Sequence, residues 1–444
     1  MKLKKFDFKL PDEDKRKKKI ILTSISVITI ILILTIASTF AYYQSIDNQN
    51  PIEAQVGEFN SADVILSVVI DGQVSSSFPD RWSGYLSSNV TCDKGASGKW
   101  NNVKWSIEIE NVTQSKTTCN VFFTTQPVLK DLMLAQFGGE SAIEIAPTNT
   151  FNTASVATTK AMYKMEDDYG DSYYYRGAKT LLDNNLIFAG YQWKIVRING
   201  DGSIRIIYNG ECPNNTCAIN TVGTTTQLYG NVYSFNATAT QNTHLGYMYG
   251  SDGSTIVGAQ TNTIASAIKT YVETWYVNRI EVQGANITDK INETLFCNDR
   301  QIISGLGSNN VATNYAAYGR LYTNKTPTLK CAQQNDKFTL SDGSLGNADL
   351  IYPIGLISAD EVALAGMNYG VSNSTNYLNT NQNFWTMTPS RMYQGAASMW
   401  IATSGGELNF ASVAASIGTR VVLSLKPEVL VTGDGSATNP FKVI

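Results

Sequence analysis

The 444-residue chain has little of what catalytic and metal-binding sites commonly require. It contains a single histidine, His244, which is remote in sequence from every cysteine, so the sequence does not favour a zinc site. The HExxH, GxSxG and P-loop motifs are missing, and no GxGxxG motif stands in a suitable context. Because His244 also lacks a neighbouring serine or cysteine nucleophile pattern, we expect no enzymatic activity, no metal and no cofactor.

Residues 20–43 lack charged side chains altogether. As a helix, these 24 residues would extend about 36 Å, enough to cross a hydrocarbon core of about 30 Å. The preceding residues, 1–19, hold nine Lys or Arg and four acidic residues, a net charge of +5. Positive flanking segments stay inside the cell, so the sequence predicts a cytoplasmic basic tail at 1–19 and a transmembrane signal anchor at 20–43.

A cleaved signal peptide is the alternative for the same segment. Thr39-Phe40-Ala41 fits a small-x-small cleavage site, and cleavage after Ala41 would release the chain. The segment around it also resembles the export segment of camelysin-type envelope proteins, in which the signal is removed. We favour a retained anchor, because the apolar run exceeds the about 7–15 residues of a signal-peptide core. Either outcome places the bulk of the chain outside the cell, as a single-pass protein of the cell membrane or as a secreted one.

The part of the chain beyond residue 19 has a net charge of −8, the difference between −3 for the whole and +5 for the tail. This sign argues against binding of nucleic acid or of an anionic lipid surface. The same part holds all six cysteines. Proximity in sequence suggests three disulfides, although free buried thiols remain the alternative: Cys92–Cys119, Cys212–Cys217 and Cys297–Cys331. Closing the first and last loops would contribute on the order of 3–4 kcal/mol each.

Composition divides the extracellular part into four segments. They are a polar stalk (44–54), a small disulfide-stapled β module (55–125), a short helix with a linker (126–160) and a main domain (161–444). In the β module we expect strands at 64–70, 103–110 and 119–123, with a turn at Asp71-Gly72. An amphipathic pattern predicts the short helix over 128–137, ended by Gly138-Gly139.

The main domain begins with a hairpin and a helix. A strand over 187–198 leads through Asn199-Gly200-Asp201-Gly202 to a second strand over 203–208. The pattern over 263–276 predicts a helix with a buried stripe of Ile264, Ile268, Tyr271 and Trp275. An acidic cluster precedes both, at Glu166, Asp167, Asp168 and Asp171, and its spacing does not match an EF-hand loop. We therefore interpret it as a solvated loop in preference to a calcium site.

The C-terminal block from Tyr352 to Lys426 combines strands with one capped helix. The sequence predicts strands over 354–357, 383–390 and 419–425, and a hairpin of 398–403 with 407–410. Ser358-Ala359-Asp360-Glu361 fits the S/T-x-x-E capping box and predicts a helix over 360–365, ended by Gly366.

This order resembles the C-type-lectin-like fold, in the variant found in formylglycine-generating enzymes and in the variable proteins of diversity-generating retroelements. The matching segments are 356–361, 385–390 and 418–420, which are similar to the helix start, the tryptophan-threonine segment and the late arginine strand of that variant. The ectodomain is also similar to membrane-anchored envelope proteins of low-GC Gram-positive bacteria, through 352–361, Gly433-Asp434-Gly435 and Asn439-Pro440. The expected fold class is a transmembrane helix, a small all-β module and an α+β C-type-lectin-like domain.

The chemistry of these relatives does not transfer with the resemblance. Formylglycine-generating enzymes use a cysteine pair late in the domain, whereas this chain has no cysteine after Cys331. The Glu-Pro-Asn, Gln-Pro-Asp and Trp-Asn-Asp tripeptides of calcium-dependent lectins are also missing. A hydrolase is the weakest hypothesis, because the adjacent carboxylates of Asp360 and Glu361 would point to different sides of a helix.

We therefore expect a cell-surface protein that binds an extracellular ligand, a glycan or a protein, in adhesion. The alternative is a non-enzymatic structural or assembly component of the cell envelope. Exposed aromatic and amide side chains of the C-terminal block are the candidate ligand contacts: Trp385, Arg391, Tyr393, Trp400 and Asn409. Both tryptophans are also suited to the core, and we expect Arg420 to pair internally with a carboxylate such as Glu361.

Overall fold

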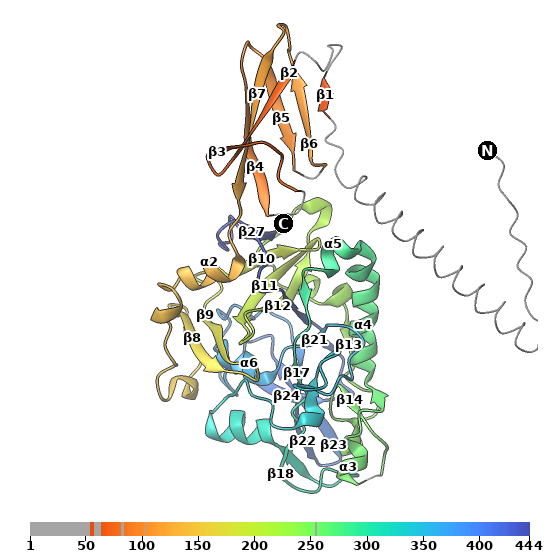
Figure 1. The fold of residues 1–444 in the computed structure, drawn as a ribbon. Helices are drawn as coiled ribbons and strands as arrows, with labels where there is room; N and C mark the ends of the chain where they lie inside the picture. Colours follow the sequence, from red (N-terminus) through yellow and green to blue (C-terminus); the bar gives the residue numbers. More distant parts are fainter. Residues whose placement is uncertain (1–53, 57–63, 81–83, 103, 254) are drawn as a thin grey trace, which may run out of the picture. The chain divides into compact units, whose positions relative to one another are not determined.

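A computed structural model describes residues 54–56, 64–80, 84–102, 104–253 and 255–444 (Figure 1). The predicted basic tail and signal anchor, and the stalk up to residue 53, lie outside these residues. Within the described ranges, no helix combines the length and the apolar character needed to cross a bilayer. The described chain is mostly β-structure with few helices, and it divides after Thr125 into a small unit and a large unit.

The small unit consists of two β-sheets around an aromatic core. One sheet has the order β3-β2-β7-β4 and the other the order β1-β6-β5. The strands are β1 (Ala54–Val56), β2 (Val64–Ile70), β3 (Gln73–Ser75), β4 (Tyr85–Cys92), β5 (Ser97–Asn101), β6 (Ser106–Glu110) and β7 (Thr117–Thr125). The ring of Trp100 from one sheet lies 5.1 Å from that of Phe123 of the other. This contact places the core between the two sheets.

Two details of the small unit follow from local conformation. The turn predicted at Asp71-Gly72 is present, with φ of 48° and 82°. The strand expected from residue 103 begins only at Ser106, because Trp105 has a φ of 54°, which interrupts an extended strand. The Cys92–Cys119 disulfide joins directly opposed residues of β4 and β7, so it links two strands of one sheet.

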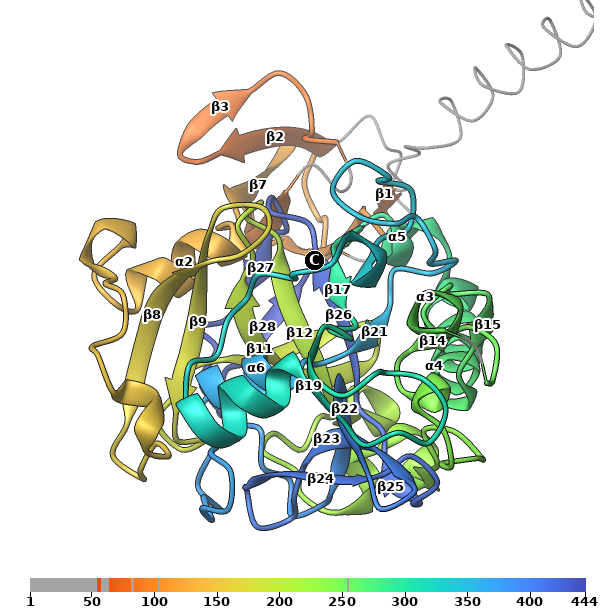
Figure 2. The same ribbon diagram turned by 90° about the horizontal axis from the view of Figure 1, so that it is seen from below.

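The large unit contains two larger sheets. The first has the order β16-β26-β12-β11-β10-β28-β27, with β21 beside β26 and the β8–β9 pair beside β11. Its strands are β8 (Lys160–Glu166), β9 (Asp171–Gly177), β10 (Asn185–Phe188), β11 (Tyr191–Ile198), β12 (Ile204–Glu211), β16 (Ile291–Asn292), β21 (Gly355–Leu356), β26 (Val421–Leu425), β27 (Val431–Thr432) and β28 (Phe441–Val443). Figure 2 shows β8 and β9 along one side of this unit and α4 along the other.

The second sheet has the order β13-β25-β22-β19-β18, extended from β22 through β23 to β24. Its strands are β13 (Val232–Tyr233), β18 (Ile302–Ser304), β19 (Thr313–Tyr315), β22 (Phe384–Tyr393), β23 (Ala396–Ala402), β24 (Leu408–Ser412) and β25 (Ile417–Gly418). The predicted hairpin of β23 and β24 is confirmed. The strand expected to turn at residue 390 instead continues to Tyr393, because irregular pairing with β23 on both sides of Pro389 accommodates the proline.

The expected strand over 187–198 is two strands. Ala189 and Gly190 have φ of 54° and 78° and form a tight turn, so β10 folds back on β11. The next predicted turn, Asn199 to Gly202, is confirmed, and it connects β11 to β12. Three antiparallel strands therefore follow one another where the sequence predicted two.

Helix α4 (Ala267–Arg279) packs through the predicted stripe only in part. Ile268 and Trp275 are fully buried, and the Trp275 ring lies 5.5 Å from that of Tyr208 on β12. Ile264 is exposed and lies in β15 (Ile264–Ala265), because the helix begins only after Ser266 caps it by accepting from the Lys269 amide. Val272, which was not among the four predicted residues, is also buried on this helix.

The short helix expected over 128–137 is α2 (Leu129–Ala135). Gly138 and Gly139, both with positive φ, follow its end as predicted. Leu129 and Met133 are fully buried in the core of the large unit. The segment expected to link the domains is therefore part of the large unit.

Candidate functional site

Six side chains from β22, β24 and two other segments of the large unit form a surface that we call the tyrosine–arginine patch. Its members are Tyr318, Tyr322, Tyr369, Arg391, Tyr393 and Phe410. Tyr322 is 41% exposed and Tyr393 is 50% exposed, and the other four are half-buried. Exposed aromatic rings gathered in this way are typical of binding surfaces, where a large apolar area carries a polar hydroxyl edge.

Arg391 lies at the centre of the patch. Its guanidinium carbon is 4.3 Å from the ring centre of Phe410, 4.7 Å from that of Tyr393 and 5.3 Å from that of Tyr318. It donates a hydrogen bond to the Tyr318 hydroxyl at 3.3 Å and forms no ion pair with the residues that the structure describes. A cation among rings, without a carboxylate partner, keeps its charge available to a ligand.

The rings themselves are stacked in order. Tyr318 stacks on Tyr322 with ring centres 4.8 Å apart, and Tyr322 meets Tyr369 edge-on at 4.6 Å. Tyr369 stacks on Phe410 at 5.8 Å. Burial and the neighbouring tyrosines raise the pKa of Tyr369, so its hydroxyl remains a hydrogen-bond donor at neutral pH. The patch therefore offers ring faces, hydroxyl groups and the Arg391 cation together, and the Lys325 ammonium group lies 5.6 Å from the ring centre of Tyr369.

Tyr318 and Tyr322 belong to a π-helix, η9 (Tyr318–Asn324). Arg320 of the same helix holds it in place through ion pairs with two aspartates. Arg320 donates to Asp360 at 2.8 Å and 3.1 Å and to Asp299 at 2.5 Å. Burial, with a smaller contribution from the Asp360 carboxylate, raises the pKa of Asp299 to about 7 against the opposing effect of Arg320. π-Helical segments are rare and occur frequently at functional sites.

Asp360 belongs to α6 (Ala359–Leu364), which begins with the predicted capping box. The Ser358 hydroxyl accepts from the Glu361 amide, and the Glu361 carboxylate accepts from the Ser358 amide. The buried Glu361 carboxylate also contacts Arg197 and Arg205, each at 2.9 Å. Although burial alone would raise the pKa of Glu361, Arg205 and Arg197 outweigh it and hold the pKa below its usual value.

Two expectations about charged residues were therefore wrong. Arg420 does not pair with Glu361, since its guanidinium donates to the carbonyl oxygens of Tyr208 and Leu378 and to the side chain of Asn209. The acidic cluster is not a solvated loop throughout, because Asp167 is buried and bonds to Arg197 at 2.6 Å.

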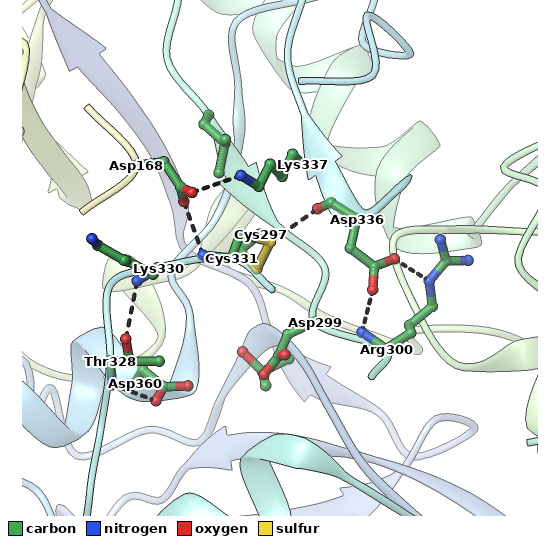
Figure 3. The surroundings of a disulfide bond; sticks show 12 residues. Asp168, Cys297, Asp299, Arg300, Thr328, Lys330, Cys331, Asp336, Lys337 and Asp360 are labelled. Atoms are coloured by element: carbon green, nitrogen blue, oxygen red, sulfur yellow. Dashed lines mark hydrogen bonds and ion pairs between the residues drawn. A yellow bond between two sulfur atoms is a disulfide. The ribbon is translucent and has the colours of Figure 1, made fainter. Parts of the chain in front are cut away.

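Figure 3 shows that Asp168 also points inward, toward the Cys297–Cys331 disulfide. Asp168 accepts from the Cys331 amide at 2.9 Å and from the Lys337 ammonium group at 2.8 Å. On the other side of the disulfide, Asp336 accepts two hydrogen bonds from Arg300. The disulfide thus fixes a segment held on one side by the buried Arg300–Asp336 ion pair and on the other by the partly exposed Lys337–Asp168 pair, next to the Arg320 contacts that position the π-helix.

All three cysteine pairs that sequence proximity suggested are disulfides: Cys92–Cys119, Cys212–Cys217 and Cys297–Cys331. His244 is buried and contacts Asp252 at 3.1 Å. Among the described residues, no group of three or more His, Cys, Asp or Glu side chains could hold a metal ion.

The structure separates the five candidate ligand contacts. Arg391 and Tyr393 lie in the tyrosine–arginine patch. Trp400 is fully buried beneath it, with its ring centre 5.7 Å from that of Phe410. Trp385 and Asn409 both align with Ile401 across the sheet, so they lie on the opposite face from Phe410. Trp385 is fully buried, with its indole N–H donating to the Tyr233 carbonyl.

The sequence did not point to Tyr318, Tyr322, Tyr369 or Phe410. Tyr318 and Tyr322 have a four-residue spacing that brings side chains to one face of a helix, and this was the available signal. Tyr369 and Phe410 join them only through tertiary contacts. No family model, no curated protein and no solved structure matches this chain.

Proposed function

We propose that this chain is a cell-surface protein that binds an extracellular glycan at the tyrosine–arginine patch. In this proposal residues 20–43 anchor it in the cell membrane, the N-terminus is cytoplasmic, and the large unit is a C-type-lectin-like domain. The three disulfides support an extracellular location, because disulfides persist in oxidising compartments. The capped helix α6 and the hairpin of β23 and β24 support the lectin-like class.

One observation carries the choice of ligand: the exposed ring of Tyr393 and the half-buried rings of Tyr318 and Phe410 surround Arg391. This arginine has no carboxylate partner among the described residues. A sugar ring has an apolar face of C–H groups and a rim of hydroxyl groups. Tyrosine faces can cover the former at a low cost in side-chain entropy, whereas Arg391 and the tyrosine hydroxyls can bond to the latter.

The direct experiment is a glycan array probed with residues 44–444 and with variants of the patch. Arg391→Ala and Tyr393→Ala should each lower binding by about tenfold, as central contacts of binding surfaces do. Tyr233→Ala is the matched control, because Tyr233 is an exposed tyrosine that stacks on Tyr271 outside the patch. Binding that survives both patch variants, or that falls equally with the control, would contradict the assignment of the site.

The alternative is a structural or assembly component of the envelope whose patch contacts only proteins. Tyrosine and arginine are also enriched at the centres of protein interfaces, and this favours the alternative as a second candidate. Silence on the glycan array, together with crosslinking from Tyr393 to an envelope protein, would replace the first proposal by this one.

A further inference from the structure

A cavity of about 580 Å³ opens in the large unit and shares no residue with the tyrosine–arginine patch. Its size falls within the range of about 300–1,000 Å³ that is usual for small-molecule sites. The side chains that matter for its chemistry are Gln192, Tyr208, Glu211, Gln227, Tyr229 and Arg279.

Rigid elements form the walls of this cavity. Gln192 comes from β11, Tyr208 and Glu211 come from β12, and Arg279 is the last residue of α4. The loop closed by the Cys212–Cys217 disulfide follows β12 directly and contributes to the lining. Gln192 donates to the Thr221 hydroxyl at 3.0 Å, which ties the following segment to β11. The site is therefore formed before any ligand enters.

The inner part of the cavity is lined by polar side chains that have unused hydrogen-bonding atoms. Tyr208 is only 1% exposed, and its hydroxyl makes no hydrogen bond to any described residue. The side-chain oxygen of Gln227, which is 2% exposed, also has no hydrogen-bond partner within the described part of the chain. The Gln227 oxygen packs against Gly418, whereas the Tyr208 hydroxyl is not among the fully buried unpaired atoms and is free to bond to a ligand with hydrogen-bonding groups of its own.

The rim of the cavity carries one charge of each sign. Glu211 and Arg279 are both exposed, and no ion pair joins them or links either to another described residue. The Arg279 guanidinium lies 5.4 Å from the ring centre of Tyr229. Beyond the effect of burial, Glu211 raises the pKa of the Tyr208 hydroxyl and Arg279 lowers it, so both charges act on the same inner group.

We infer that this cavity binds a small zwitterion, a free amino acid or a short peptide with both ends unblocked. Arg279 receives the carboxylate, Glu211 receives the ammonium group, and the Tyr208 hydroxyl bonds to the part that enters the cavity. A neutral sugar would leave both rim charges without a partner, and a simple anion or cation would use only one of them. The inference does not depend on the proposed glycan site.

Calorimetric titration of the full chain in detergent tests the inference with alanyl-alanine and a panel of free amino acids as probes. At least one probe should bind at micromolar to millimolar concentration. Its N-acetylated form and its C-terminal amide should each bind about tenfold more weakly, since each loses one charge-assisted contact. Equal binding of the blocked forms, binding of neutral monosaccharides alone, or no binding at millimolar concentration would overturn the proposal.

Variants of the rim assign each end of the ligand to one residue. Arg279→Gln should abolish the preference for a free carboxylate and keep the preference for a free amine, whereas Glu211→Gln should do the reverse. Tyr208→Phe should weaken all probes by several fold while the near-UV circular dichroism stays unchanged. Tyr393→Ala is the control and should leave the titrations unaltered, while glycan binding at the patch is scored separately. If the two rim variants do not reverse the preferences in this way, the assignment is wrong.

Discussion

Two regions of the large unit bury cations in opposite ways. Around α6, Arg197 and Arg205 share the carboxylate of Glu361, and Arg197 also bonds to Asp167. Around Lys194 of β11 and Arg420, by contrast, neutral oxygens hold the cations. The ammonium group of Lys194 donates to the side-chain oxygens of Asn185 and Asn220. Arg420, which directly precedes β26, is likewise held by carbonyl and amide oxygens.

The difference appears in the pKa values. Burial alone would lower the pKa of Arg197, yet the carboxylates of Glu361 and Asp167 raise it above its usual value. Burial, together with the nearby cations of Arg420 and Lys179, lowers the pKa of Lys194 to about 7. Burial likewise lowers the pKa of Arg420 to about 9. Arg197 thus remains charged and joins distant segments, although burial lowers the pKa of Arg205 despite the same Glu361 carboxylate, whereas Lys194 titrates near neutral pH.

Removing the shared carboxylate should have the largest effect. Glu361→Gln leaves Arg197 and Arg205 buried without their common counter-charge and weakens the capping box of α6. We expect a loss of about 3–5 kcal/mol in the free energy of unfolding, measured by denaturant titration. A loss below about 1 kcal/mol would show that the pairing around α6 is not needed.

Glu166→Gln is the matched control for this prediction. Glu166 pairs with Lys330 at 2.6 Å, but both side chains are more than half exposed. The change should therefore alter the free energy of unfolding by less than about 0.5 kcal/mol.

Asp299 tests the region around α6 in which carboxylates pair the buried cations, because its pKa is raised to about 7 although Arg320 contacts it. Between the ordinary pKa of aspartate and about 7, the folded state binds more protons than the unfolded state, so stability falls as the pH rises through this window. Asp299→Asn removes this titration. Relative to the wild type, the variant should gain on the order of 2 kcal/mol between about pH 5 and pH 7, by denaturant unfolding at each pH.

The opposite result is equally informative. If the Arg320–Asp299 pair dominates, Asp299→Asn will destabilise the protein at both pH values and the pH slope will not change. Asp342→Asn provides a control, since Asp342 is partly exposed and its carboxylate accepts only from Ser344 and Leu345 of its own turn.

The region around α6 also shows which features can be predicted from the sequence alone. The capping box of Ser358 and Glu361 and the turn at Asn199 to Gly202 were predicted correctly, because their signals lie within four residues. The contact of Arg197 with Glu361 joins residues 164 positions apart, and nothing in either local pattern specifies the partner. For the same reason Glu361 was expected beside Arg420.

The residues of the tyrosine–arginine patch likewise divide into those that the sequence indicated and those that only the fold brings together. Arg391 and Tyr393 could be selected from one strand, whereas Tyr369 and Phe410 join them only through the fold. The missed turn at Ala189 and Gly190 has a different cause, because alanine at a φ of 54° gives none of the composition signals of a turn. Individual residues suited to binding could therefore be predicted from the sequence, whereas the surface that they form together could not.

Lys194→Met should change stability least at neutral pH and still distinguish the two regions. Methionine removes the cost of burying the amine but leaves the side-chain oxygens of Asn185 and Asn220 without a donor, so the net change at about pH 7 should be within about 1 kcal/mol. The pH dependence is the sharper measurement. Between about 7 and the ordinary pKa of lysine, the unfolded state binds more protons than the folded state, so wild-type stability should rise with pH by at most about 1.4 kcal/mol per unit relative to the variant. A flat difference from about pH 7 to pH 9 would mean that Lys194 remains charged, and the two regions would then bury their cations alike.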